Sequence, residues 1–328
     1  MPTGTDAGAS IERELETHRR ALTGYCYRML GSGSEAEDAV QETMVRAWRA
    51  ADTLQEQAAL KSWLYRIASN VCFDMLQGPQ RRATPMDLGP ASAADAALGA
   101  PQESWIQPIA DARVVPADGD PAEIAAGRET LRLAFVAALQ HLPARQRAVL
   151  ILREVLRWQA SEVAELLDTS VASVNSALQR ARATLESLDL DATSGPSDVD
   201  GAVEQDLLAK YVDAFERYDM DHLVALLQRD AAFSMPPFPL WVQGPDDIVK
   251  FMTGTGAKCE GSRVKVTAAN GGPAVAIYNR AEDGGFQGWA IVIVETSGGK
   301  ISGLHHFLYP ELFEQFGLPL RLEADDAA

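Results

Sequence analysis

The sequence is short of cysteine, of long apolar runs and of positive charge. Its 328 residues include three cysteines, Cys26, Cys72 and Cys259, and none belongs to a C-x-x-C pair. This odd number argues against a disulfide framework and fits a reducing compartment. No stretch approaches the roughly 20 apolar residues of a membrane-spanning helix, and the polar residues 1–10 do not resemble a signal peptide. We expect a cytoplasmic protein, and no motif indicates a metal site or a cofactor.

The charge is negative overall but unevenly distributed. The net charge of −17 at pH 7 is a poor match to a protein that coats DNA. Residues 12–82 carry no net charge and residues 128–186 carry +2, whereas residues 83–127 carry −6 and residues 187–328 carry −12. Only the first two of these blocks are suited to approach nucleic acid.

Length and patterning predict several domains. A chain of this length, 47% of it hydrophobic, can form two or three separate cores. Helical periodicity covers residues 11–82 and returns over residues 128–188. The segment between them, 83–127, is rich in Ala, Pro, Gly and Asp and predicts an acidic linker. Residues 189–201 predict a second linker, and residues 202–320 a third domain.

The first two domains are predicted to be all α. In the first, an apolar stripe recurs at the spacing of one helix face: Val40, Met44, Ala47 and Trp48. In the second, a short helix over 161–167, a turn over 168–170 and a longer helix over 171–187 form a helix-turn-helix pattern. Asp168 stands where Gly is usual, and Asp tolerates the left-handed backbone that this turn needs.

The third domain is predicted to be α+β with a curved antiparallel sheet. Two amphipathic helices within 203–228 and a short helix over 245–253 precede the β-like runs. The turns between these runs are rich in Asn, Asp and Gly, which are hairpin signals. The runs are Arg263–Ala269, Ala274–Arg280, Phe286–Glu295 and Ile301–Leu308.

Several segments resemble one protein family. DAVQETMVRAW at 38–48 and SWLYRIASN at 62–70 resemble region 2 of extracytoplasmic-function (ECF, group 4) sigma factors. LPARQRAVLILRE at 142–154, with the helix-turn-helix after it, resembles region 4. The last third resembles the SnoaL-like, NTF2-type cone. The resemblance implies two helical sigma domains and an α+β cone in a protein that binds RNA polymerase core and directs promoter-specific transcription initiation.

The resemblance also implies binding residues. One helix would dock on the β′ clamp helices, and region 4 would approach the β flap. The implied contacts with core polymerase are Asp38, Gln41, Glu42 and Arg46. Those with the promoter −10 element are Gln55, Glu56, Gln57, Arg66, Asn70, Arg81 and Arg82. Those with the −35 element are Ala172, Ser173, Asn175, Ser176, Gln179, Arg180 and Arg182.

The C-terminal domain is expected to regulate in cis. Trp105 and Pro108, in the otherwise featureless acidic linker, are expected to make an interdomain contact. His305 and His306 are adjacent on a predicted strand, so only one faces the cone. The candidate pocket residues, which would contact a small ligand, are Phe233, Trp241, Trp289 and His305. No nucleophile–base set marks an enzyme, and a separate anti-sigma factor would not be needed.

Two other functions remain open from the sequence. A stand-alone helix-turn-helix repressor would bind operator DNA without polymerase. A SnoaL-type cyclase fused to a regulator would need an acid–base pair in the cone. The two region 2 segments argue against the repressor, and the weak pocket chemistry argues against the cyclase.

Overall fold

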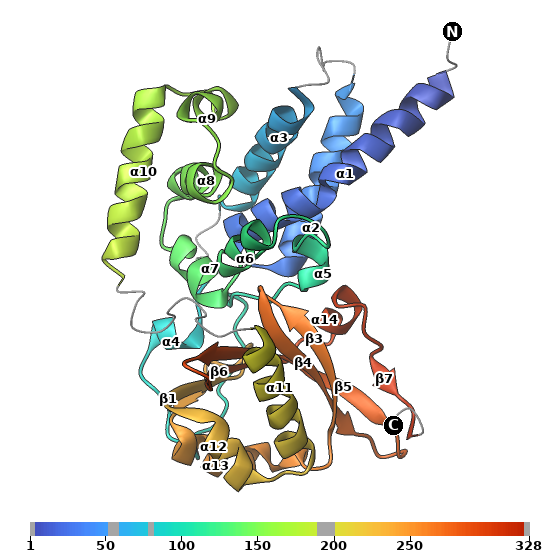
Figure 1. Ribbon diagram of the computed structural model, residues 1–328, viewed down its shortest axis with the longest axis vertical. Helices are drawn as coiled ribbons and strands as arrows, with labels where there is room; N and C mark the ends of the chain where they lie inside the picture. The colour runs from blue at the N-terminus through green and yellow to red at the C-terminus, as the bar shows by residue number, and fades with distance from the viewer. Residues whose placement is uncertain (1–3, 52–58, 78–81, 189–200, 325–328) are drawn as a thin grey trace. The chain divides into compact units, whose positions relative to one another are not determined.

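The structure is a computed structural model that describes residues 4–51, 59–77, 82–188 and 201–324 (Figure 1). The described residues form two compact units. The first combines the helices up to Arg82 with those from Arg113 onward, and the second combines Ala83–Ala112 with the C-terminal third. Among these residues, no helix is long and apolar enough to cross a membrane.

Three long helices open the first unit. They are α1 (Gly4–Leu30), α2 (Gly33–Arg49) and α3 (Leu60–Met75). Ser32 caps α2 by accepting a hydrogen bond from the backbone N–H of Glu35. Between α1 and α3, the buried Tyr25 hydroxyl is 2.7 Å from that of Ser69. The predicted all-α first domain is therefore confirmed, with a polar contact inside its apolar core.

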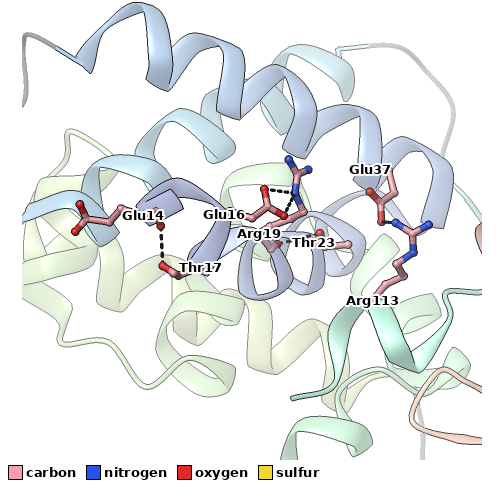
Figure 2. A network of polar contacts seen from close by, with 7 residues as sticks. All are labelled: Glu14, Glu16, Thr17, Arg19, Thr23, Glu37 and Arg113. Atoms are coloured by element: carbon pink, nitrogen blue, oxygen red, sulfur yellow. Dashed lines mark hydrogen bonds and ion pairs between the residues drawn. The ribbon is translucent and has the colours of Figure 1, made fainter. Parts of the chain in front are cut away.

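Polar contacts also stabilise the surface of this bundle (Figure 2). Arg19 Nε donates to both carboxylate oxygens of Glu16, one turn away on α1, at 2.7 and 2.9 Å. Arg113, in the short helix α5 (Asp111–Val114), forms an ion pair with Glu37 of α2 at 3.2 Å. This pair joins two parts of the first unit that are far apart in the sequence.

The second half of the first unit contains the predicted helix-turn-helix. It begins with α6 (Pro121–Glu129), α7 (Leu133–Gln140), α8 (Ala144–Leu150) and the π-helical turn η3 (Ile151–Val155). The motif itself is α9 (Ala160–Leu166) followed by α10 (Val171–Glu186). Asp168 lies between them with a φ of 51°, the left-handed conformation that the sequence predicted.

The second unit is built on a mixed sheet. Its strands are β1 (Leu227–Ser234), β2 (Trp241–Gln243), β3 (Arg263–Ala269), β4 (Gly272–Arg280), β5 (Phe286–Ser297), β6 (Lys300–Phe307) and β7 (Arg321–Leu322). The order is β2-β1-β6-β5-β4-β3, with β7 on β5. The β3–β6 meander is antiparallel as predicted, but β1 runs parallel to β6, so the sheet is not purely antiparallel.

Helices cover one face of this sheet and form the cone (Figure 1). They are α11 (Gly201–Glu216), α12 (Met220–Leu226) and α13 (Pro245–Thr253), followed by the 3₁₀ turn η5 (Thr255–Cys259). Their apolar side chains share one core with alternate strand residues, among them Phe233, Val292 and Leu304. The short helix α14 (Glu311–Gln315) follows β6.

Residues 83–112, named the strap below, belong to the second unit. The composition assigned them to an acidic linker, yet they include the short helix α4 (Pro85–Leu88) and a fully buried Trp105. Ala94 joins the cone core. Backbone hydrogen bonds also hold the strap to the rest of this unit, such as the one from the Gln102 N–H to the Pro237 carbonyl at 2.9 Å. The strap therefore needs few buried apolar side chains to stay folded.

Candidate polymerase and promoter interface

The α2 residues predicted to contact polymerase lie on one surface of the helix. Asp38, Gln41 and Arg46 are exposed and Glu42 is half-buried. Arg46 Nε donates to Glu42 at 2.7 Å, and Arg46 lies 3.4 Å from Asp74 of α3. The surface therefore presents carboxylates that are already partly neutralised by one guanidinium.

Trp48 adds an aromatic side chain to this surface. The sequence placed it on the buried stripe, but its side chain is 56% exposed, and Val45 is also exposed. The buried face of α2 instead passes through Val40, Thr43 and Ala47. Thr43 can lie inside because its hydroxyl donates to the Ala39 carbonyl at 2.7 Å. The apolar-stripe prediction is therefore wrong for Trp48.

The predicted −10 residues divide into three groups. Gln55, Glu56, Gln57 and Arg81 lie outside the described residues. Asn70 is exposed on α3, as direct base reading requires. Arg82 and Arg66 both have protein partners, and Arg82 forms an ion pair with Glu35 at 2.5 Å.

Arg66 contacts the second half of the first unit. Its Nη2 donates to the Glu165 carbonyl at 2.7 Å, and its Nε lies 3.3 Å from the Leu166 carbonyl. These are the last carbonyls of α9, which a helix leaves unsatisfied. A guanidinium predicted to hold a DNA phosphate thus caps the first helix of the helix-turn-helix.

The predicted −35 residues share the exposed face of α10. Asn175, Ser176 and Gln179 point to solvent, whereas Val174, Leu178 and Ala181 are buried. The full set is exposed: Ala172, Ser173, Asn175, Ser176, Gln179, Arg180 and Arg182. Ser170 caps the helix by accepting from the Ser173 N–H at 3.1 Å. Arg182 is partly engaged, because it pairs with Glu154 at 2.5 Å.

In the cone, the structure brings together Phe233, Trp289 and His306 rather than His305. The ring centroids of Phe233 and His306 are 4.4 Å apart, and those of Trp289 and His306 are 6.0 Å apart. Burial lowers the pKa of His306 to about 3, so its ring is neutral. Its Nδ1 is buried and has no hydrogen-bond partner among the residues that the structure describes. The candidate pocket residue His305 therefore has to be replaced by His306.

His305 faces the other side of the sheet, where the sequence indicated no cluster. Its Nδ1 lies 2.8 Å from the Ser234 hydroxyl, and its Nε2 lies 3.3 Å from Glu295. Gly303 leaves room for this pair, since a Cβ there would lie 2.7 Å from His305 Nε2. Ser234 and His305 are both buried, so these contacts satisfy the imidazole away from solvent.

Three further predicted residues involve the strap: Trp105 and Pro108 belong to it, and Trp241 contacts it. The Trp105 indole donates to the Pro237 carbonyl at 2.6 Å, and Pro108 is buried nearby in the chain. Trp241, assigned to the pocket, instead donates from its indole to the Gly89 carbonyl at 3.0 Å. Its neighbour Val242 belongs to the cone core, so Trp241 points to the opposite face.

Comparison with known proteins identifies the family. Family models match three stretches: Sigma-70 region 2 at residues 15–82, Sigma-70 region 4 at 132–185 and a SnoaL-like domain at 208–304. The chain is 43% identical over 311 residues to the ECF RNA polymerase sigma factor SigG of Mycobacterium tuberculosis (strain ATCC 25618 / H37Rv), covering 93% of this chain and 82% of that protein.

The chain belongs to the ECF RNA polymerase sigma factors.

Like other members, this sigma factor binds RNA polymerase core and directs initiation at promoters, and sigma factors are not themselves enzymes. It is also 27% identical over 252 residues to SigJ of M. tuberculosis (strain ATCC 25618 / H37Rv), which covers 74% of this chain and 72% of that protein. The crystal structure of M. tuberculosis SigJ has the same fold, with a TM-score of 0.61 and 22% identity over 94% of this chain and 99% of that one. The fused sigma and SnoaL-like architecture is therefore shared.

Proposed function

We propose that this sigma factor contacts polymerase through the exposed surface of α2 and reads promoters through α3 and α10, under control of its own C-terminal domain. The α2 surface comprises Asp38, Gln41, Glu42, Arg46 and Trp48. Its partner is a helical element of the polymerase, the β′ clamp helices that the family resemblance implies. Carboxylates beside an exposed Trp suit such a partner, because aromatic anchors dominate binding energy at interfaces. This activity places the protein in the cytoplasm with the polymerase.

Promoter reading is assigned to amides on two helices. Asn70 on α3 is exposed, and it matches a position that the family uses to read the −10 element. Asn175 and Gln179 on α10 are exposed one turn apart, and both side chains can pair bidentately with adenine in the major groove. Region 4 would lie near the β flap when it reaches the −35 element.

The strap carries the proposal of control in cis. Its 30 residues connect Arg82, the last residue of region 2, to the helices that lead into region 4. Both halves of the strap are bonded to the cone domain. Asn270 exchanges two hydrogen bonds with Ile109, and Asp111 accepts from the Gly271 N–H at 2.8 Å. While the strap stays folded there, the distance between its own ends is fixed.

A released strap would behave differently. A fully extended segment of this length spans roughly 100 Å. Release would therefore let region 2 and region 4 move apart, which promoter binding requires. We propose that, by holding the strap, the C-terminal domain acts as an internal substitute for a separate anti-sigma factor. We further propose that a small neutral ligand in the cone modulates it, supported by the unpartnered Nδ1 of His306.

Run-off transcription tests this function. Purified core polymerase and a promoter library would be combined with the full chain or with residues 1–190. Core-dependent transcripts from either form support the assignment. A higher yield from the shorter form supports inhibition by the C-terminal domain. Specific DNA binding without core, and no transcript from either form, would instead support a repressor.

The single variant Trp105→Phe sharpens the test of the strap. It keeps an aromatic ring but removes the indole N–H that holds Pro237. If strap capture inhibits the protein, this variant gives more transcript than the wild type. Equal yields from wild type, Trp105→Phe and Trp105→Ala would refute control through the strap without touching the sigma assignment.

A further inference from the structure

Two arginines of the second unit lie against one aromatic ring. Arg263 Cζ, at the start of β3, is 5.5 Å from the centre of the Phe286 ring, and Arg280 Cζ, at the end of β4, is 5.8 Å from it. A Cβ at Gly261, two residues before Arg263, would lie 3.6 Å from Arg280 Nη2, so the Arg280 guanidinium reaches toward β3. No ion pair or hydrogen bond joins either guanidinium to another described residue.

These side chains share the outer face of the sheet, which is the face opposite the cone core. Side chains alternate along a strand, and Ile277 of β4 belongs to the cone core, so Tyr278 points outward. Arg263 lies directly opposite Tyr278 in the ladder and shares its face. Arg280 is two residues beyond Tyr278 and lies opposite Phe286, so this pair is on the same face.

Two buried donors on this face lack acceptors. Arg263 Nε and the Tyr278 hydroxyl are buried, and neither has a hydrogen-bond partner in the part of the chain that the structure describes. The Tyr278 ring packs edge-on against Phe313 of α14, 5.2 Å between centroids, and this hydrocarbon ring cannot satisfy the hydroxyl. Burial raises the pKa of Tyr278 to about 12, so the hydroxyl remains a donor at neutral pH. Unpartnered buried donors are costly, which favours an acceptor supplied by a ligand.

We propose that Arg263, Arg280 and Tyr278 form a binding site for phosphate, either free or as the end group of a small metabolite, and that Phe286 positions the two guanidinium groups. The site is separate from the ligand proposed inside the cone, because its residues lie on the opposite face of the sheet. It is also independent of promoter reading, since all of its residues belong to the second unit.

The set of donors favours phosphate over carboxylate. A guanidinium binds either anion through two parallel N–H groups. One such fork already occupies both oxygens of a carboxylate. A phosphate monoester has three terminal oxygens, which can accept from two guanidinium groups and a hydroxyl together. Its charge of about −1.5 to −2 at pH 7 also matches two guanidinium groups.

The charges in this part of the unit also favour an anion. Two cations beside one ring repel each other, and the buried edge of Arg263 has lost its water. The ring attracts both guanidinium groups but leaves their charge in place. Other arginines of the unit are neutralised by carboxylates: Arg217 pairs with Asp213, and Arg321 pairs with Asp283 in the turn between β4 and β5. A phosphate dianion would neutralise Arg263 and Arg280 at once.

Three variants and one control separate the donors. Arg263→Gln and Arg280→Gln each remove one fork, and Tyr278→Phe removes only the hydroxyl. Without phosphate, Tyr278→Phe should melt no lower than the wild type, because the hydroxyl that it removes is unsatisfied. The control is Arg229→Gln, which removes the same charge at an exposed position on β1, two strands away from β4 and β5 on the far side of β6.

Isothermal titration calorimetry of the full chain with inorganic phosphate, at constant ionic strength, tests the site. We expect one phosphate to bind per chain. Each arginine variant should raise the Kd at least about 10-fold, and Tyr278→Phe should raise it about 3- to 10-fold. Arg229→Gln should leave the Kd unchanged, and sodium acetate should bind far more weakly than phosphate. Glucose 6-phosphate distinguishes the sources: tighter binding than inorganic phosphate indicates a phosphorylated metabolite, and equal or weaker binding indicates free phosphate.

Three results would overturn the site. They are no saturable binding of phosphate, which would leave water as the partner of the two donors, binding that survives the arginine variants, and acetate binding as tight as that of phosphate. If Arg263→Gln does not fold, Arg280→Gln decides, because the Arg280 side chain is exposed. None of these results bears on the sigma assignment, which run-off transcription tests separately.

Discussion

The indole N–H of Trp105 donates to the carbonyl of Pro237, 132 residues away in the sequence. This bond ties the strap to the loop between β1 and β2. Trp105 is 0% exposed, so removing the side chain leaves a large void. We expect Trp105→Ala to lower the free energy of unfolding of the second unit by about 3–5 kcal/mol. The unfolding transition of this unit in urea measures the change.

Trp105→Phe separates the hydrogen bond from the packing. The ring still fills part of the space, but the Pro237 carbonyl loses its indole donor and keeps only the bond from the Gln102 N–H. A cost of about 1–3 kcal/mol is expected for the lost hydrogen bond together with the smaller ring. If Phe proves as harmful as Ala, the hydrogen bond rather than the ring packing holds the strap.

The neutral ring of His306 predicts a dependence of stability on pH. Its pKa is about 3 in the folded protein, below the value of about 6.5 of an unfolded chain. The unfolded chain thus binds a proton first as the pH falls, and stability present above pH 6.5 is progressively lost toward pH 3. We expect the titration of this residue to lower the free energy of unfolding by about 2 kcal/mol between pH 6 and pH 4.5.

His306→Phe isolates this contribution. The variant keeps an aromatic ring against Phe233 and Trp289 but cannot titrate. Denaturation curves at several pH values should show a shallower loss of stability on acidification than in the wild type. Parallel pH profiles for the two proteins would show that His306 is hydrated and titrates normally.

Two glycines of the sheet form a matched pair. A Cβ at Gly303 would lie 2.7 Å from His305 Nε2 and 3.0 Å from Glu295, whereas a Cβ at Gly272 meets nothing within 4 Å. Gly303→Ala should therefore cost about 1–3 kcal/mol through overpacking. Gly272→Ala should be close to neutral. Thermal melts of both variants test this, and equal melting temperatures would mean that the His305–Glu295 pair moves aside freely.

Local signals in the sequence predicted much of the fold. The run Arg263–Ala269 became β3 with the same bounds, since the Asn270-Gly271 turn after it adopts positive φ at both residues. Asp168 was likewise found in the left-handed conformation. Such features depend on a few neighbouring residues, and each can be inferred from chain chemistry alone.

Non-local pairing was harder to infer. β1 includes the exposed Arg229 and Asp230, where its register against β6 shifts. It pairs in parallel with β6 about 70 residues later, so no hairpin signal in the sequence predicts the pairing. The strap has little periodicity because bonds to the cone domain, not its own helices, order it. Which of His305 and His306 faces the cone depends on the register of β6, and the sequence alone does not specify that register.

The exposed amides of α10 give the sharpest test of promoter reading. Asn175 has no core role, since its neighbour Val174 makes the buried contact. If Asn175 pairs with an adenine, Asn175→Ala loses about 1–3 kcal/mol of discrimination at one base pair. Run-off transcription from a library randomised across the −35 element should then show relaxed preference at that position only. Glu186→Gln, in the last turn of the same helix, should leave the preference intact. Uniformly weaker transcription from every sequence would assign Asn175 to general phosphate contact instead.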